Sequence, residues 1–372
     1  SKRLSELTKK PNAPFLYGYS YQGQFWARSK SMYLLGAGVT EDGVQEGLEA
    51  LLIEAERVSR FGFTETELER TKNDILRNKE RAYEERDKTD SRQYTRAYIR
   101  NFLENNPIPG IEVELGIYKQ FLPQIQLTEV NTLAQTWITD RNRVIAIDGP
   151  EKEGLEIPGE TDLMAVFDAV KKMKITPYED VFLDKPLIES IPVPSKVVTE
   201  NHTEELGVTE WTLENGVRLI LKPTDFKNDE VLFSARSPGG SSLVDDNKYV
   251  AAMTATSVIK EAGIGQFNQI ELDKMLAGKI ARVNPYISGI EEGFNGSASP
   301  QDLETLFQLI HLYFSAPRLD SSAFLAYQER MNGFLENRSS RPETAYRDTI
   351  QVTMAQHHLR SRPWSTELLT EM

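Results

Sequence analysis

A proline-rich stretch between Gly149 and Gly207 is the feature that most limits how this 372-residue chain can fold. The hydrophobic periodicity on either side of it gives way here to prolines and charged residues, a composition typical of an extended linker. The chain is also too long for one ordinary domain. We therefore expect two lobes, residues 1–150 and 208–372, joined by a long linker over residues 151–207, with one or two helical turns near residues 163–174. The prolines are Pro150, Pro158, Pro177, Pro186, Pro192 and Pro194.

The first flanking region mixes strand and helix patterns. Residues 16–21 and 31–37 alternate as strands, and apolar side chains recur at helical spacing from Val44 to Val58. Gly62 can end that helix, and Thr64 with Glu67 forms a capping box that begins the next one. We expect a strand over residues 143–147 to close this lobe.

The second flanking region also mixes strand and helix patterns. Asn215-Gly216 predicts a hairpin turn, and residues 231–237 predict a strand that leads into a helix from about residue 248. Later strands and three further helices are expected before residue 358. The chain therefore reads as an α+β protein, with two lobes of mostly antiparallel sheet and helices packed on one face.

The composition excludes several classes of function. Asp and Glu number 56 against 43 Lys and Arg, and the signs are interleaved, so no basic face for nucleic acid is expected. No apolar run reaches the length of a membrane span. The chain has no cysteine, which removes disulfides, thiolate catalysis and cysteine–zinc sites.

Two stretches carry a resemblance to a known family. Residues 211–221, with their hairpin, and a strand that ends near Gly239-Gly240-Ser241 before a helix resemble the start of a lobe in the insulinase/pitrilysin family of zinc peptidases. Arg3-Leu4-Ser5-Glu6-Leu7 and the later Gly62 to Leu68 segment are similar to parts of the lobe that follows the catalytic one. The resemblance implies the end of a second lobe (1–150) and most of a third, incomplete lobe (208–372).

The third lobe lacks the family's metal motif. The catalytic lobe of the family carries H-x-x-E-H, with two histidines for zinc and a glutamate as general base. The matching positions here are Met253, Thr256 and Ser257, none of which supplies an imidazole or a general base. The resemblance therefore implies a degenerate lobe, with no catalytic or metal-binding residue in this chain and zinc in the missing catalytic lobe of the parent. The four histidines, none with metal-site spacing, are His202, His311, His357 and His358.

Aromatic residues of the first strand region are candidates for lining a peptide chamber. Tyr17, Tyr19 and Trp26 could face such a chamber, or they could pack on the sheet face as strand aromatics usually do. The family's substrate-gripping arginine is not carried over, because Thr8 stands at its position.

The resemblance implies a non-catalytic internal part of a zinc endopeptidase that degrades or processes peptides in a closed chamber. Its partners would be the catalytic lobe of the same polypeptide and a peptide substrate, and the resemblance favours the bacterial periplasm or cell envelope. A non-enzymatic scaffold or assembly subunit on the same fold is the first alternative, and an unrelated α+β binding module is the second. Upstream H-x-x-E-H in the parent would separate the first two. The sequence leaves open the peptide substrate and cleavage preference, the oligomeric state, the compartment and whether the parent keeps an intact zinc site.

Overall fold

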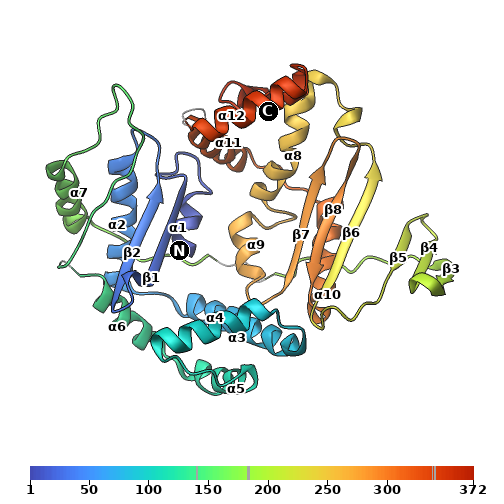
Figure 1. The fold of residues 1–372 in the computed structure, drawn as a ribbon, viewed down its shortest axis with the longest axis horizontal. Coiled ribbons are helices and arrows are strands. Elements are labelled where there is room, and N and C mark those ends of the chain that lie inside the picture. Colours follow the sequence, from blue (N-terminus) through green and yellow to red (C-terminus); the bar gives the residue numbers. More distant parts are fainter. Residues whose placement is uncertain (140, 182–184, 337, 339–340) are drawn as a thin grey trace.

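The computed structural model describes residues 1–139, 141–181, 185–336, 338 and 341–372, and only the backbone of Phe25 and Trp26. Two lobes lie side by side, with the first lobe at the left of Figure 1 and the second at the right. Helices and strands are mixed in both, and every strand pairing within the described residues is antiparallel. The predicted α+β class is therefore confirmed. Among the helices of these ranges, none has the length and apolar character that crossing a membrane requires.

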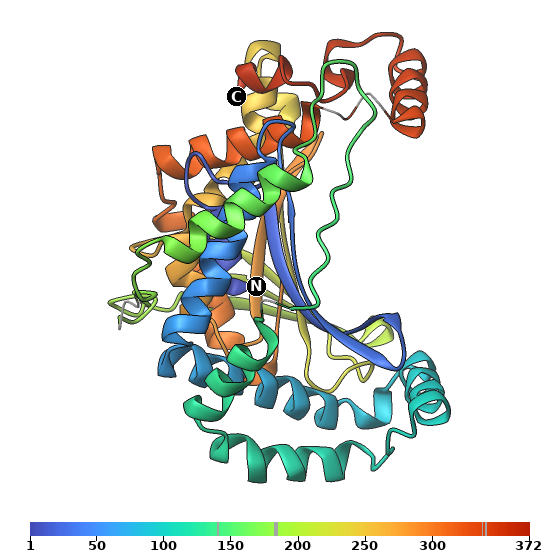
Figure 2. The ribbon, with the colours of Figure 1, turned by 90° about the vertical axis from the view of Figure 1, so that its left-hand side faces the viewer.

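The first lobe is built on a strand pair. Strands β1 (Tyr17–Ala27) and β2 (Lys30–Gly38) pair with each other. Helix α2 (Val44–Phe61) packs on β2, and α7 (Glu160–Lys172) packs on α2, so that the two helices run side by side in Figure 2. Burying apolar side chains between these layers holds them together. The buried centre consists of Leu4, Phe15 and Leu51.

Further helices of the first lobe run along one end of the molecule, below the strands in Figure 1. The longest of them starts at Thr64, where the predicted capping box is present: the Thr64 hydroxyl accepts from the Glu67 amide, and the Glu67 carboxylate accepts from the Thr64 amide. Gly62 ends α2 with a φ of 75°, as expected. These helices, with the short one at the start of the lobe, are α1 (Lys2–Leu7), α3 (Glu65–Glu84), α4 (Ser91–Glu104), α5 (Ile111–Phe121) and α6 (Leu127–Trp137).

The second lobe is built on a three-stranded sheet in the order β6 (Val231–Pro238), β8 (Glu291–Ala298), β7 (Ala281–Ile287). Helices α8 (Tyr249–Ala262) and α10 (Leu303–Ser315) pack against it. The remaining helices are α9 (Gln269–Met275), α11 (Ser321–Glu336) and α12 (Pro342–Met354). The buried core, larger than that of the first lobe, consists of Leu187, Ile264, Phe267, Leu272, Val283, Ala298, Leu306, Leu309, Ile310 and Leu312.

A separate small sheet lies on the far side of the second lobe from the first (Figure 1). It has the order β3 (Val197–Thr203), β4 (Val208–Leu213), β5 (Arg218–Leu221). The predicted hairpin joins β4 to β5, and Gly216 in its turn has a φ of 85°. That conformation suits glycine because it has no Cβ.

Two expectations differ from the structure. Residues 143–147 form no strand, and Val144 is 92% exposed. A strand needs a neighbour for its backbone groups, and β1 and β2 pair only with each other within the described chain. The expected linker over 151–207 also contains more regular structure than one or two helical turns, because α7 and β3 lie within it.

Helix α7 is held on α2 by one apolar stripe and by capping contacts. Leu163 and Val170, seven residues apart on the same helical face, are buried. Arg60 of α2 donates hydrogen bonds of 2.9 Å and 2.8 Å to the carbonyl oxygens of Lys171 and Met173, at the C-terminal end of α7. The last turn of a helix has no following amides to donate to its carbonyl groups, so the arginine both caps and docks α7.

A buried ion pair joins the two lobes. Nη2 of Arg77 on α3 lies 2.8 Å from Oδ2 of Asp229, just before β6, and both side chains are less than a tenth exposed. Asn228 adds contacts to the end of α3, because its amide donates to the Glu85 carboxylate at 2.9 Å. A buried charge is costly without its partner, so these contacts fix where the second sheet begins relative to α3.

The capping box predicts a specific stability effect. Thr64→Ala should lower the free energy of unfolding by about 1 kcal/mol, because it leaves an amide at the start of α3 without its acceptor. Urea unfolding at neutral pH measures this change in the free energy of unfolding. Thr132→Ala is the matched control, since the Thr132 hydroxyl donates to the Thr128 carbonyl inside α6 and does not cap a helix start. Equal losses from the two variants would contradict the role of Thr64.

Candidate functional site

The three positions that the sequence comparison matched to the metal motif lie in the middle of α8. Met253, Thr256 and Ser257 are all half-buried there. One turn after Thr256, the Lys260 ammonium donates to the Asn284 side chain on β7 at 2.8 Å, which directs this part of the helix towards the sheet. Thioether and hydroxyl groups do not replace the imidazoles of a zinc site. Over the described ranges, no three His, Asp or Glu side chains are grouped so that they could hold a metal ion.

The tyrosines of β1 form an exposed aromatic row, which we call the tyrosine face. Tyr17, Tyr19 and Tyr21 are 51%, 45% and 46% exposed, and they share one face of the strand because side chains alternate along it. The ring of Tyr17 stacks on Phe334 of α11, with centroids 6.4 Å apart. The side chain of Trp26, the third candidate, lies outside the described residues.

Two glycines on β2 make this row possible. Gly38 pairs with Tyr17 and Gly36 with Tyr19 across the ladder. A Cβ at Gly36 would lie 2.5 Å from the Tyr19 ring, and one at Gly38 would lie 2.3 Å from the Tyr17 ring. The rings therefore lie flat over the neighbouring strand and still leave about half of each side chain in solvent. The packing of the rings on the neighbouring strand is therefore observed, and the chamber-lining role of these aromatics stays a prediction.

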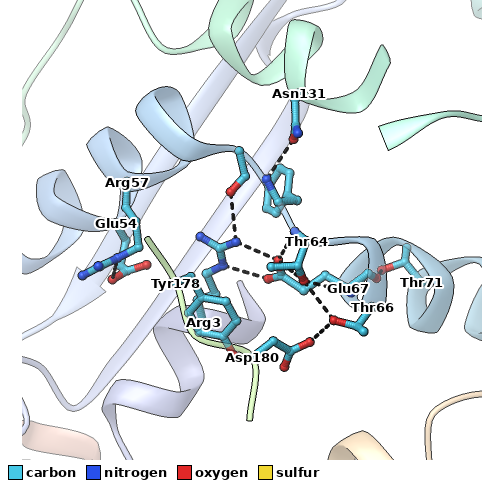
Figure 3. Close-up of polar contacts among 12 residues, drawn as sticks. Arg3, Glu54, Arg57, Thr64, Thr66, Glu67, Thr71, Asn131, Tyr178 and Asp180 are labelled. Atoms are coloured by element: carbon cyan, nitrogen blue, oxygen red, sulfur yellow. Dashed lines mark hydrogen bonds and ion pairs between the residues drawn. The ribbon is translucent and has the colours of Figure 1, made fainter. Parts of the chain in front are cut away.

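A second site, which sequence reasoning missed, surrounds Arg3 of α1. Its Nε and Nη2 each lie 2.7 Å from a different oxygen of Glu67, and Nη2 also donates to the Gly62 carbonyl (Figure 3). The guanidinium lies 4.2 Å from the centroid of the Tyr178 ring, and the Arg3 side chain is only 7% exposed. The planar guanidinium group of arginine favours this geometry, with paired hydrogen bonds to a carboxylate and stacking on an aromatic ring.

Charged residues beside Arg3 join the two lobes. Lys274 on α9 places its Nζ 2.8 Å from Asp180 Oδ1 and 3.3 Å from Glu6 Oε1 on α1. The Tyr178 hydroxyl donates to Glu6, and Nη2 of Arg70 on α3 lies 2.5 Å from Asp180 Oδ2. The segment that follows α7 is thus held between α1, α3 and α9.

The environment keeps each of these groups in one protonation state. Burial disfavours the charged form of Asp180, but hydrogen bonds from Lys274, Thr66 and Arg70 outweigh it and lower the Asp180 pKa to about 2. Burial likewise opposes the charge on Lys274, but Asp180 and Tyr178 outweigh it and raise the Lys274 pKa. Burial raises the Tyr178 pKa to about 12. A general acid or base needs a pKa near the working pH, so these three groups are suited to holding and binding rather than to proton transfer.

One signal in the sequence could have pointed to part of this cluster. Glu67 was identified as the partner of Thr64 in the capping box, and its second role with Arg3 uses the same carboxylate. Lys274, Tyr178 and Asp180 lie far from Arg3 in sequence and carry no motif. Only the packing of the lobes brings them together.

Comparison with known proteins relates the chain to zinc proteases. No protein-family model matches the chain. An Arabidopsis thaliana protein named zinc protease PQQL-like is 28% identical over 260 residues, which cover 70% of this chain and 25% of that protein. The probable zinc protease PqqL of Escherichia coli strain K12 is 21% identical over 319 residues, which cover 84% of this chain and 34% of the relative. The chain is related to zinc proteases of the insulinase/pitrilysin type.

A solved structure shares the fold of this chain. The whole chain superposes on 41% of the crystal structure of a mutant of the ferredoxin protease FusC in complex with Arabidopsis ferredoxin, with a TM-score of 0.59 and 16% identity. This likeness concerns the fold alone. The chain spans about a quarter to a third of the length of the two curated zinc proteases.

The lowered pKa of Asp180 predicts acid sensitivity. The folded value of about 2 lies below the ordinary 3.8, so this carboxylate stabilises the fold fully above about pH 4 and loses that effect as the pH falls towards 2. Asp180→Asn should lower the free energy of unfolding by about 2 kcal/mol at neutral pH, and the difference from the unmodified chain should shrink between about pH 4 and pH 2. Urea unfolding across this range tests it. The exposed Asp148→Asn is the control, and a pH-independent deficit in Asp180→Asn would contradict the assigned cause.

Proposed function

We propose that this chain is a non-catalytic internal part of a zinc-dependent endopeptidase that degrades or processes peptides in a closed chamber. Its curated relatives are named zinc proteases, and it matches only a fraction of their length. In this proposal residues 1–150 are the later part of a second lobe, and residues 208–372 are most of a third, degenerate lobe. Residues 151–207 connect them.

The side chains of α8 are the observation that carries the proposal. Met253, Thr256 and Ser257 occupy the motif positions and do not fit a zinc ion, because they offer no imidazole and no carboxylate. The zinc of the parent would therefore be held by a catalytic lobe elsewhere in the same polypeptide. That lobe is the proposed partner of this chain, and no chemical step is assigned to α8.

The proposed contribution of this chain is a wall of the chamber. The tyrosine face offers three half-exposed rings, which can contact apolar and polar groups of an extended peptide. It is positioned against the second lobe, because Tyr17 stacks on Phe334. The Arg3 and Lys274 contacts hold the lobes in one arrangement, and catalysis requires a peptide held in a fixed place and shielded from water.

Substitution at the motif positions tests the non-catalytic role. In the full-length parent, Thr256→Ala and Ser257→Ala should leave kcat and the zinc content nearly unchanged, within about twofold, because neither residue takes part in the chemistry. Elemental analysis and peptide hydrolysis measure the two quantities. A thousandfold loss of kcat with folding intact, or loss of zinc, would show that this lobe is catalytic. A parent without zinc or hydrolysis would instead favour the scaffold alternative.

Substitution on the tyrosine face tests the chamber wall. Tyr19→Ala in the parent should raise KM for a peptide substrate about 3- to 10-fold and leave kcat unchanged, because it removes a contact made equally before and during the reaction. Tyr346→Ala, which removes a 68% exposed tyrosine from α12, is the matched control. Equal kinetics for the two variants would contradict a role for the tyrosine face in binding peptide.

A further inference from the structure

A cavity of about 510 Å³ lies between α1, α2, α3 and α9, beside strand β2. Its volume falls within the range of pockets that bind small ligands. Part of the wall is apolar, formed by Leu35, Val58, Phe63 and Ile270. Arg3 and Glu54 also line it, and each carries a buried polar atom that stands without a partner among the described residues.

Arg3 has one hydrogen-bonding position left over. Its Nε and Nη2 are committed to Glu67 and the Gly62 carbonyl, but Nη1 is buried and has no acceptor within the described chain. In Figure 3 this nitrogen points away from Glu67, towards the side on which Glu54 lies. The residue is 7% exposed, so its remaining N–H groups are not freely solvated. A buried donor of this kind favours an acceptor that enters the cavity.

Glu54 presents the complementary group. Its Oε1 accepts from Arg57 Nε at 2.9 Å, whereas Oε2 is buried with no donor among the residues that the structure describes. The residue is 9% exposed. Arg57 is directed elsewhere by a further hydrogen bond to the carbonyl of Thr176. The free carboxylate oxygen therefore favours a cationic or neutral donor inside the cavity.

We propose that this cavity binds a short peptide with free termini. Its carboxylate would accept from Arg3 Nη1, its ammonium group would donate to Glu54 Oε2, and its side chains would contact the apolar wall. One ligand thereby satisfies both buried groups, which a simple anion or a simple cation does not. The volume favours two or three residues over a single amino acid. The proposal does not depend on the proposed protease function, because it concerns binding at a place away from α8 and from the tyrosine face.

Calorimetric titration with defined peptides tests the proposal. The protein is the full-length parent treated with a chelator, so that peptide is not consumed, and the probe is the tripeptide Ala-Leu-Ala. Capping either end, by N-acetylation or by C-terminal amidation, should weaken binding at this site about tenfold, because each removes one charge-assisted hydrogen bond. Free leucine should bind more weakly than the tripeptide.

Variants separate this cavity from any other peptide site in the parent. Glu54→Gln should weaken the free tripeptide about tenfold and leave the N-acetylated form unaffected, whereas Glu56→Gln on the same helix, as the matched control, should change neither. Arg3→Lys should weaken the free and the N-acetylated tripeptide and have less effect on the amidated form, with thermal unfolding as a check that the lobe is folded. Titrations unchanged by Glu54→Gln would overturn the proposal, including the case in which another segment of the parent fills the cavity.

Discussion

The pairing of Arg3 with Glu67 is the contact on which much of the lobe arrangement depends. Both oxygens of Glu67 bind Arg3, and one of them also accepts from the Thr64 amide at the start of α3. The Arg3 guanidinium lies in turn against the Tyr178 ring. The Arg3 guanidinium therefore fixes the relative positions of α1, the start of α3 and the segment after α7. Removal of either charge would leave the other buried, which is why this contact tolerates little change.

A second set of charges extends this contact to the other lobe. Lys274 of α9 lies between Asp180 and Glu6, and Asp229 before β6 lies against Arg77 of α3. Lys9 and Arg330 meet on Glu261 of α8. Such ion pairs favour one packing of the lobes over others. An alternative packing would leave several buried charges without a partner, which is costly. These polar contacts thus contribute to the orientation of the lobes.

Local signals predicted local structure well. The capping box at Thr64, the helix end at Gly62 and the turn at Asn215-Gly216 were all found where the sequence placed them, because each depends on residues within a few positions. The strand expected over 143–147 was wrong, since its apolar alternation has no neighbouring strand to pair with in the described chain. The sequence analysis predicted too little regular structure in the linker, where helix α7 and strand β3 lie. Each of them is stabilised by packing against another element, α7 against α2 and β3 against β4.

The sequence by itself determined the α+β class and the relationship to zinc proteases. The class follows from hydrophobic periodicity and turn residues, and the relationship follows from motifs that resemble a known family; neither needs knowledge of distant contacts. Only the tertiary structure decided that the tyrosines of β1 stand half in solvent over Gly36 and Gly38, and that Arg3 and Glu54 face one cavity. Arg3 and Glu54 lie on different helices, and Tyr178 and Lys274 lie more than 100 positions further along the chain. Their proximity is a result of how the helices and lobes pack, and no local pattern encodes it.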